Sequence, residues 1–387
     1  MSSLTQPHPA AVSDHALSTP VDPGALADAR ERLLPRIEAA LQLVLDRQTA
    51  TPPGHLLPRG GSADAPPAPL APHAPGHYGM MRYHLGWLDE HLAPVDGPAG
   101  KRLRPLLCLL AAETCGGSAE AAMPTAVALE LLHNFSLIHD DIEDGDALRH
   151  HRSTVWKLWG HAQAINAGDG MHVLAYLALM PLADSGASSE LVLRLVAQLG
   201  ETALVLTEGQ HLDLAFERRD DVSPAEYLDM IARKSAALFS CATAAGAEVA
   251  CNRPAWQAAL TNYGYQLGMG FQIRDDLLGI WGAEETTGKP AGDLYRRKKT
   301  LPTLYALSRA EPADQESLRR LFSQAEPGEE DVALALTALD HTGARRHCEQ
   351  LVSRYSLAAR EHLSVLPASR ARDALHALAV QLETRES

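Results

Sequence analysis

Two pairs of adjacent aspartates, each following an apolar stretch, constrain the fold of this chain more than any other feature. The first is Asp140-Asp141, with Asp144 close behind, and the second is Asp275-Asp276. Carboxylates are costly to bury unless a positive charge lies between them. Hard divalent cations prefer carboxylate oxygen and usually also hold the phosphates of a substrate. The fold is therefore expected to bring the two acidic segments together around cations, in a site for a phosphorylated compound.

The composition and periodicity of the sequence favour helices. Hydrophobic residues make up 46% of the 387 residues and aromatic residues only 5%, with Ala and Leu dominant, a mixture typical of helical proteins. After Met80, apolar residues recur at helical spacing almost to the end of the chain, with no alternating strand pattern and no solenoid-like repeat. We therefore predict an all-α fold. Residues 78–387 are expected to form one catalytic domain, a large antiparallel helical bundle around a central apolar cavity.

The first 77 residues differ in composition from the rest and are predicted to be a flexible N-terminal extension. Residues 1–22 are polar, contain proline and lack periodicity, as disordered segments do. From about residue 23 to residue 48, apolar residues recur at helical spacing and predict one amphipathic helix. Pro35 either kinks this helix or marks its first turn. Residues 51–77 are rich in Pro, Ala, Gly and His, which indicates a flexible linker or surface loop.

Charge and cysteine content exclude several classes of protein. The formal net charge of −14 argues against a nucleic-acid-binding protein, which needs basic patches to meet phosphate. The five cysteines are odd in number, lack metal-type spacing and are typical of buried thiols in a reducing compartment. No apolar run reaches the length of a transmembrane segment, and no basic-then-apolar signal pattern opens the chain. We expect a cytoplasmic protein.

The spacing of the first acidic motif suits metal binding. On a helix, Asp140 and Asp144 stand about 6 Å apart along the axis and on the same face, with Asp141 rotated off it. Such a pair can bind one or two Mg²⁺ ions and leave oxygens for a ligand. A solvated acidic face or a helix-cap cluster is the common alternative for this pattern, and the apolar lead-in argues against it. The repetition in Asp275-Asp276 strengthens the metal interpretation.

Basic residues form a set that matches the acidic motifs. Lys101, Arg102 and Arg104 precede a strongly apolar helix, and a helix N-terminus with added basic side chains suits a diphosphate. Lys234 lies among apolar residues, where it is costly without an anionic partner. The other basic residues are Arg149, Arg152, Lys289 and the run Arg296–Lys299. For at least two of the four residues in that run, a solvated charged face is the simpler explanation.

Together the motifs describe a site for two diphosphates and a hydrocarbon chain, as needed to ionise an allylic diphosphate and capture the cation. From about Met80 to Pro302, their order resembles that of the trans-polyprenyl diphosphate synthases. This resemblance implies the all-helical isoprenoid-synthase fold and the condensation of isopentenyl diphosphate with an allylic diphosphate. Gly100–Pro105 resembles the isopentenyl-diphosphate motif of the family, and His133 matches a position that helps to hold the same group.

The resemblance also implies the roles of individual residues. Glu208-Gly209-Gln210-x-x-Asp213 resembles the family's Gly-Gln-x-x-Asp element, and Lys234-Ser235 its Lys-Thr element. Gln210 and Gln272 are cation-facing positions or, as an alternative, ordinary interhelix hydrogen-bonding groups. The metal ligands implied, for three Mg²⁺ ions with the allylic diphosphate bound, are Asp140, Asp141, Asp144, Asp275 and Asp276. The catalytic residues implied are Asp140, Asp144, Arg149, Lys234, Gln272, Asp275 and Lys289. The substrate-binding residues implied are Lys101, Arg104, His133, Arg149, His150, Lys234, Gln272 and Lys289.

Three positions depart from the pattern of the family. Gly279 stands where a third aspartate usually ends the second motif, and His150 replaces a second arginine. The segment Gly292-Asp293-Leu294 is one residue shorter than the usual Gly-x-Asp-Leu. The first two departures favour an alternative, a class I terpene synthase that acts on an allylic diphosphate without condensation. The intact isopentenyl-diphosphate motif opposes that alternative, because a cyclase has no such substrate to hold.

Product length is expected to depend on the residues below the first motif. Phe135 lies five positions before Asp140, with Ser136 beside it, and a bulky residue there implies a short-chain enzyme by resemblance. We expect geranylgeranyl diphosphate as the product and farnesyl diphosphate next, although Phe135 has plain core packing as its alternative role. The resemblance further implies a homodimer. A third hypothesis, a non-catalytic partner subunit, is opposed by the intact first motif, which such subunits usually lose.

Overall fold

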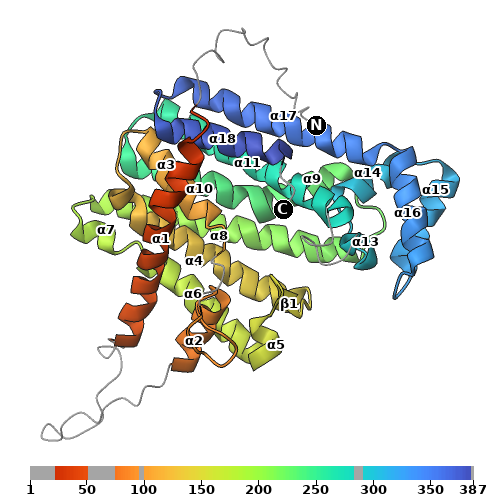
Figure 1. Ribbon diagram of the computed structural model, residues 1–387, viewed down its shortest axis with the longest axis horizontal. Coiled ribbons are helices and arrows are strands. Elements are labelled where there is room, and N and C mark those ends of the chain that lie inside the picture. The colour runs from red at the N-terminus through yellow and green to blue at the C-terminus, as the bar shows by residue number, and fades with distance from the viewer. Residues whose placement is uncertain (1–21, 51–74, 96–99, 283–290, 385–387) are drawn as a thin grey trace, which may run out of the picture.

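The fold is all-α, as predicted. The computed structural model describes residues 22–50, 75–95, 100–282 and 291–384, and within them helices dominate (Figure 1). The named strands of this part of the chain are β1 (Leu148–Arg149) and β2 (Arg152–Ser153), an antiparallel pair. The N-terminal helices are α1 (Ala25–Ala50), α2 (Pro75–His84), α3 (Leu103–Thr114), α4 (Ala119–Glu143), α5 (Val155–Trp159), α6 (His161–Leu177) and α7 (Pro181–Asp184).

The C-terminal half continues the bundle and adds a smaller group of helices at one end. The central helices here are α8 (Ser189–Glu217), α9 (Pro224–Ile231), the π-helical turn η2 (Ala232–Ala236), α10 (Ala237–Ala250) and α11 (Pro254–Trp281). The last helices are α13 (Gly292–Tyr295), α14 (Leu301–Arg309), α15 (Pro312–Ser323), α16 (Glu329–His341), α17 (Ala344–His362), the 3₁₀ turn η3 (Leu363–Val365) and α18 (Arg370–Thr384). Helices α15 and α16 project from one end of the bundle (Figure 1) and enclose a small second core.

Helix α4 carries the first acidic motif at its C-terminal end. Ser118 caps its N-terminus by accepting a hydrogen bond from the backbone N–H of Ala121, and an apolar run then packs it against α3, α6 and α10. By length and hydropathy α4 could cross a membrane, but 67% of its most apolar window is buried inside the bundle. This burial is the behaviour of a core helix, and it places Asp140 at the edge of the apolar interior.

Helix α11 carries the second acidic motif and lies very close to α10. A Cβ atom on Gly264 would lie 2.5 Å from the carbonyl oxygen of Phe239, and one on Gly268 would lie 2.7 Å from Cα of Ala236. Only glycine permits this approach of the two backbones. The close contact places Gln272, one turn further along α11, beside Ser235 of η2.

Helix α1 was expected from about residue 23 to residue 48 and spans Ala25–Ala50, with Pro35 inside it. The side chains of Leu33, Ile37 and Leu41 are completely buried, because α1 packs against α3, α4 and α18. The predicted boundary at residue 77 therefore does not separate α1 from the helical body. The predicted disorder of residues 1–22 and the linker at 51–77 lie almost entirely outside the described residues.

Candidate active site

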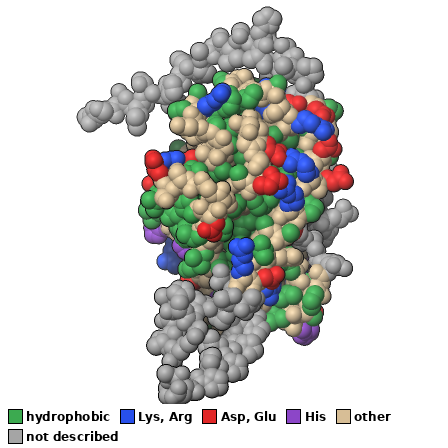
Figure 2. Space-filling model, turned by 90° about the vertical axis from the view of Figure 1, so that its left-hand side faces the viewer, with side chains coloured by type: hydrophobic (Ala, Val, Ile, Leu, Met, Phe, Trp, Pro, Cys, Tyr) green, Lys and Arg blue, Asp and Glu red, His purple; other side chains and the backbone are tan. Residues whose placement is uncertain are grey.

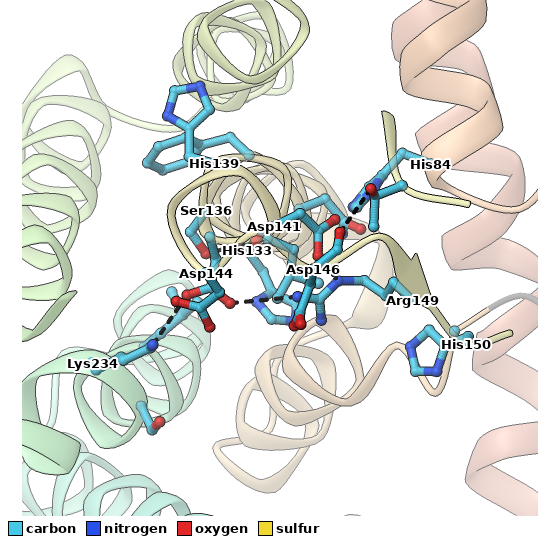
Figure 3. Close-up of a pocket in the computed structure, with 18 of the residues that line it drawn as sticks. His84, His133, Ser136, His139, Asp141, Asp144, Asp146, Arg149, His150 and Lys234 are labelled. Atoms are coloured by element: carbon cyan, nitrogen blue, oxygen red, sulfur yellow. Dashed lines mark hydrogen bonds and ion pairs between the residues drawn. The ribbon is translucent and has the colours of Figure 1, made fainter. Parts of the chain in front are cut away.

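One cavity of about 1120 Å³ brings the predicted groups together (Figure 3). It is lined by α4, α8, α10, α11, η2 and the loop before α3. Of the predicted site residues, Asp276 does not line it, and Lys289 lies outside the described residues. The predicted residues that do line it are Lys101, Arg104, His133, Phe135, Ser136, Asp140, Asp141, Asp144, Arg149, His150, Lys234, Gln272 and Asp275.

Lys234 bridges two acidic helices at the centre of the cavity. Its Nζ lies 3.0 Å from Oδ1 of Asp140 on α4 and 2.5 Å from Oδ2 of Asp213 on α8. Burial alone would lower the pKa of Lys234, but these two carboxylates raise it, so the side chain is charged. A Cβ atom on Gly209 of α8 would lie 2.3 Å from the backbone nitrogen of Lys234. The glycine thus lets η2 approach α8, and such π-helical turns are frequent at functional sites.

Arg149 pairs with the first two aspartates of the motif. Its Nε donates to Oδ1 of Asp141 at 2.7 Å, and its Nη2 lies 3.4 Å from Oδ2 of Asp140. Burial opposes the ionisation of Asp140, but Lys234 and Arg149 outweigh it and lower its pKa. For Asp144, burial and the neighbouring Asp140 raise the pKa to about 6. The predicted spacing is confirmed, because Asp140 and Asp144 both face the cavity from one side of α4.

The two aspartates of the second motif separate in space. Asp275 lines the cavity, whereas Asp276 is only 3% exposed and points between helices. Oδ2 of Asp276 accepts hydrogen bonds from the Tyr227 hydroxyl at 2.8 Å and from the Leu301 backbone N–H at 3.3 Å. Burial raises the pKa of Asp276 to about 7. The prediction that Asp276 binds metal does not fit this position, in which it joins α11 to α9 and α14.

Gln272 forms an interhelix hydrogen bond, the alternative role weighed for it. Its Oε1 accepts from the Ser235 hydroxyl of η2 at 2.6 Å, and within α11 its Nε2 donates to Oδ1 of Asp276 at 3.2 Å. Gln210 also lines the cavity, and its Nε2 is buried without a hydrogen-bond partner in the described part of the chain. An unpaired buried donor is costly. Gln210 is therefore the better candidate for a group that faces a ligand.

A pair of basic side chains also lines the cavity. Arg104 and His133 lie side by side and partly buried, with 2.9 Å between Nη1 and Nε2. The Arg104 guanidinium lies over the Phe239 ring, 4.8 Å from its centroid, and its Nε has no hydrogen-bond partner among the described residues. Burial lowers the pKa of Arg104 to about 10, so it keeps its charge at neutral pH. A buried guanidinium with an unused N–H suits an anion, and Lys101 and His150 line the same region.

Arg102 does not belong to the diphosphate cradle in which the sequence placed it. Its guanidinium pairs with Glu38 at 2.6 Å and with Glu130 at 3.0 Å. Arg102 lines the cavity together with Lys101 and Arg104, but its guanidinium is already engaged by these carboxylates. Two carboxylates satisfy Arg102, so it has a structural role in this loop.

Two residues of the cavity were not singled out from the sequence. Nζ of Lys298 lies 3.6 Å from Oδ2 of Asp144, which makes it the member of the basic run that faces the site. The other members pair elsewhere, for example Arg297 with the carbonyl oxygen of Gln324. His84, at the end of α2, is buried in the cavity wall, and burial followed by Arg149 lowers its pKa to about 3. Only the tertiary fold reveals these positions.

Phe135 and Ser136 lie below the first motif as predicted. The Phe135 ring is 6% exposed and stacks on His172 of α6, with 4.4 Å between centroids and 17° between planes. The Ser136 hydroxyl donates to the carbonyl oxygen of His133 at 2.8 Å. Phe135 is therefore fixed by its neighbour on α6 while it closes part of the cavity.

The carboxylates fit magnesium better than a metal with a complete protein shell. Among the described residues, no three Asp, Glu, His or Cys side chains converge tightly enough to hold an ion alone. Mg²⁺ usually keeps several waters and is bound through one or two carboxylates together with substrate phosphates. Asp140 and Asp144 on α4, opposite Asp275 on α11, offer such carboxylates, and Oδ2 of Asp141 is buried without a hydrogen-bond partner.

Comparison with known proteins identifies the family. The family model described as polyprenyl synthetase matches residues 86–339. The chain belongs to the polyprenyl synthetase family. The recognition from sequence is confirmed, and as a member of this family the chain is an enzyme that transfers prenyl groups.

Individual polyprenyl synthetases resemble the chain over most of its length. A (2E,6E)-farnesyl diphosphate synthase of Mycobacterium tuberculosis is 39% identical and covers 77% of this chain and 84% of its own length. A geranylgeranyl diphosphate synthase of the same organism is 44% identical over 61% of this chain and 67% of its own length. The crystal structure of a polyprenyl synthetase from Streptomyces coelicolor superposes with a TM-score of 0.77 at 35% identity, covering 93% of this chain and 98% of the other.

Proposed function

We propose that this polyprenyl synthetase is a Mg²⁺-dependent, short-chain trans-prenyl diphosphate synthase. It condenses isopentenyl diphosphate with an allylic diphosphate, to give geranylgeranyl diphosphate first and farnesyl diphosphate next. The observation that carries the proposal is the arrangement of one cavity. The acidic groups Asp140, Asp144 and Asp275 line the same cavity as the partly buried pair of Arg104 and His133. Two anion sites of different chemistry suit two different diphosphates.

The acidic groups suit the allylic diphosphate. Magnesium held by Asp140, Asp144 and Asp275 would neutralise the departing diphosphate and polarise its bond to carbon. A structural relative from Corynebacterium glutamicum, a geranylgeranyl pyrophosphate synthase of 27% identity and TM-score 0.75, is described as complexed with isoprenyl diphosphate and magnesium. Lys234 and Arg149 border the same site and add fixed positive charge where negative charge develops. Lys289 lies outside the described residues, and its place in this group stays a prediction.

The basic pair suits isopentenyl diphosphate. Arg104 and His133 are partly buried, and Lys101 and His150 line the same cavity, so several basic groups would grip the diphosphate. This leaves the double bond of isopentenyl diphosphate directed towards the allylic carbon. After the new carbon–carbon bond forms, the proton is lost to the released diphosphate, so no protein base is required. Binding and orientation are then the main contributions of these residues.

The length of the product follows from the floor of the cavity. Phe135 stacks on His172 and limits the depth available to a growing hydrocarbon tail. Relatives named for farnesyl and for geranylgeranyl products are both similar to this chain, so similarity alone does not select the length. Phe135 is one bulky side chain about one turn below Asp140, and we infer that such a barrier favours the twenty-carbon product.

Two other functions fit the same fold less well. A class I terpene synthase would ionise an allylic diphosphate without condensation, and it would have no use for the Arg104–His133 pair. A non-catalytic partner subunit would not need the complete carboxylate set that faces the cavity. We retain the terpene synthase as the alternative that the experiment below must exclude.

The exposed faces of α6 and α8 support a homodimer. Val173 and Leu177 on α6 are 58% and 47% exposed, and Leu193 and Leu204 on α8 are 68% and 62% exposed. Apolar side chains grouped at helical spacing on neighbouring surfaces mark protein interfaces. Figure 2 looks at the left-hand side of Figure 1 and shows hydrophobic side chains grouped on one face, with charges towards its edge. The five cysteines are unpaired thiols, which supports the proposed cytoplasmic location.

Incubation of the purified chain with Mg²⁺, labelled isopentenyl diphosphate and dimethylallyl, geranyl or farnesyl diphosphate tests the proposal. Products are compared before and after phosphatase treatment. A labelled prenyl diphosphate that phosphatase converts to its alcohol supports the synthase and gives the chain length. Diphosphate release with an unlabelled hydrocarbon or alcohol, formed from the allylic substrate alone, would replace the synthase with the terpene-synthase alternative.

A further inference from the structure

The loop before α3 holds a non-glycine residue in a left-handed conformation. Arg102 has φ 44° and ψ 41°, a region that side chains other than those of Gly, Asn and Asp rarely adopt. The residue is 4% exposed. It lies between Lys101 and Arg104, both of which line the cavity. The turn at Arg102 therefore sets the direction in which the two diphosphate-binding side chains leave the backbone.

Contacts from three other segments hold this turn. Nη1 of Arg102 donates to Glu130 on α4 at 3.0 Å, and Nη2 donates to the carbonyl oxygen of Leu85 at 2.9 Å. Nε donates to Oε1 of Glu38 on α1 at 2.6 Å. Glu130 also accepts from Asn134, the residue after His133, at 3.1 Å. The network thus connects the loop with the part of α4 that presents His133.

Glu38 is the member of this network that lies farthest from Arg102 along the chain, before the part that the family model matches. The family model begins at residue 86, whereas Glu38 lies on α1, 64 residues before Arg102. Its other oxygen accepts a hydrogen bond from the Trp87 indole at 3.0 Å, so both carboxylate oxygens are engaged. Its side chain is 20% exposed and that of Arg102 is 3% exposed. A bidentate carboxylate fixes a guanidinium far better than a single contact does.

We propose that Glu38 is a positioning residue for the isopentenyl-diphosphate pocket. Through Arg102 it fixes the left-handed turn that places Lys101 and Arg104, so α1 contributes to binding without touching substrate. The inference rests on the proposed function. It does not extend to the allylic site, because the network meets α4 at Glu130 and Asn134, before Asp140, and makes no contact with Lys234 or Asp275.

Steady-state kinetics of Glu38→Gln, with each diphosphate varied in turn, tests the proposal. Glutamine keeps the shape of the side chain but removes the charge that orients Arg102. We expect KM for isopentenyl diphosphate to rise about tenfold, as small displacements of binding groups do, while kcat and KM for the allylic diphosphate change less than about twofold. The matched control is Glu31→Gln, an exposed glutamate on the same helix, which should leave all three constants unchanged.

Trp87→Phe is the second variant, because it removes the indole N–H that donates to Glu38 and keeps an aromatic ring at this position. It should raise KM for isopentenyl diphosphate in the same direction by a smaller factor, and it decides the question if Glu38→Gln does not fold. Unchanged KM values, or equal rises for both substrates, would overturn the role of Glu38. A wild-type chain that incorporates no isopentenyl diphosphate would instead refute the proposed function, so the two failures are distinct.

Discussion

The carboxylate of Asp293 fills the space that a side chain on residue 279 would need. A Cβ atom on Gly279 would lie 1.9 Å from Oδ2 and 2.5 Å from Cγ of Asp293. Asp293 is 8% exposed, and Arg296 donates to its Oδ1 at 3.2 Å. The third carboxylate that the second motif lacks in sequence is therefore replaced in space by one from α13. This explains why two departures from the family pattern, Gly279 and the shortened segment around Asp293, occur together.

Gly279→Asp should destabilise the protein, because the new carboxylate would overlap Asp293. We expect a loss of about 1–3 kcal/mol in the free energy of unfolding, typical of overpacking. Removing the obstacle in Gly279→Asp/Asp293→Gly should recover part of that loss. Urea unfolding followed by circular dichroism measures both changes, and Asn262→Asp on an exposed position of α11 is the control for added charge. Equal stability of Gly279→Asp and the wild-type chain would contradict the steric explanation.

The requirement for Mg²⁺ should increase as the pH falls. Burial and the neighbouring Asp140 raise the pKa of Asp144 to about 6, so a proton occupies this carboxylate below that pH and competes with the metal. For one displaced proton, the Mg²⁺ concentration that gives half-maximal activity should rise by up to about tenfold per pH unit below about pH 6. Titrations of activity with Mg²⁺ across this range measure the effect, with circular dichroism to confirm folding. A Mg²⁺ requirement that stays constant with pH would show that protonation of Asp144 does not compete with metal binding.

Lys298 should contribute to the reaction although it lies in a run of basic residues. Its Nζ lies 3.6 Å from Asp144, and its side chain is 42% exposed, so solvent weakens the interaction. We expect Lys298→Met to lower kcat by about tenfold, less than the loss of a fully enclosed stabilising group. Arg297→Met is the matched control, since Arg297 donates to Gln324 instead. Equal kcat values for the two variants would show that Lys298 does not contribute to the reaction.

Shortening Phe135 should lengthen the product. Phe135 is buried against His172, so Phe135→Ala opens space below Asp140 where a longer tail can pass. We expect the products of Phe135→Ala to be longer than those of the wild-type chain by one or more five-carbon units. The products of Phe135→Leu should be intermediate in length. Chromatography of the phosphatase-treated alcohols gives the distribution. An unchanged product in both variants would indicate that Phe135 is ordinary core packing.

Charges placed on the apolar faces of α6 and α8 should dissociate the proposed dimer. Val173→Asp and Leu204→Asp each bury a charge in that interface if it exists, and should weaken association by at least about tenfold. Sedimentation velocity at several concentrations reports the change. Leu334→Asp, on the distant helix α16 and 38% exposed, should leave association unchanged. A wild-type chain that sediments as a monomer would refute the dimer directly.

The sequence predicted those features that depend on helical spacing. Asp140 and Asp144 face the same cavity because they are one turn apart, and α1 was found from its apolar stripe. Adjacent residues on a helix point about 100° apart, and of the second pair Asp275 lines the cavity whereas Asp276 does not. Which one did so depended on how α11 packs against α9 and α10, and the sequence does not contain that orientation.

The sequence also did not show which basic side chains have a structural role and which face the site. Arg102 and Lys298 both belong to basic clusters, but Arg102 is bound by Glu38 and Glu130, whereas Lys298 faces Asp144. The partner that decided the role of Arg102 lies on a helix 64 residues earlier in the chain. Such assignments require the tertiary contacts, because the local sequence around each cation looks alike.

The pairing of Lys234 with Asp140 and Asp213 also bears on how substrates enter. An acidic cluster without internal counter-ions would repel an incoming diphosphate strongly at close range. Here the protein supplies its own counter-ion in Lys234, so under the proposed function binding of a diphosphate would exchange ionic partners, with Lys234 passing from carboxylate to phosphate. The released carboxylates would then be left for Mg²⁺ to neutralise. Such an exchange would favour the arrival of metal and diphosphate together over the arrival of either ion alone.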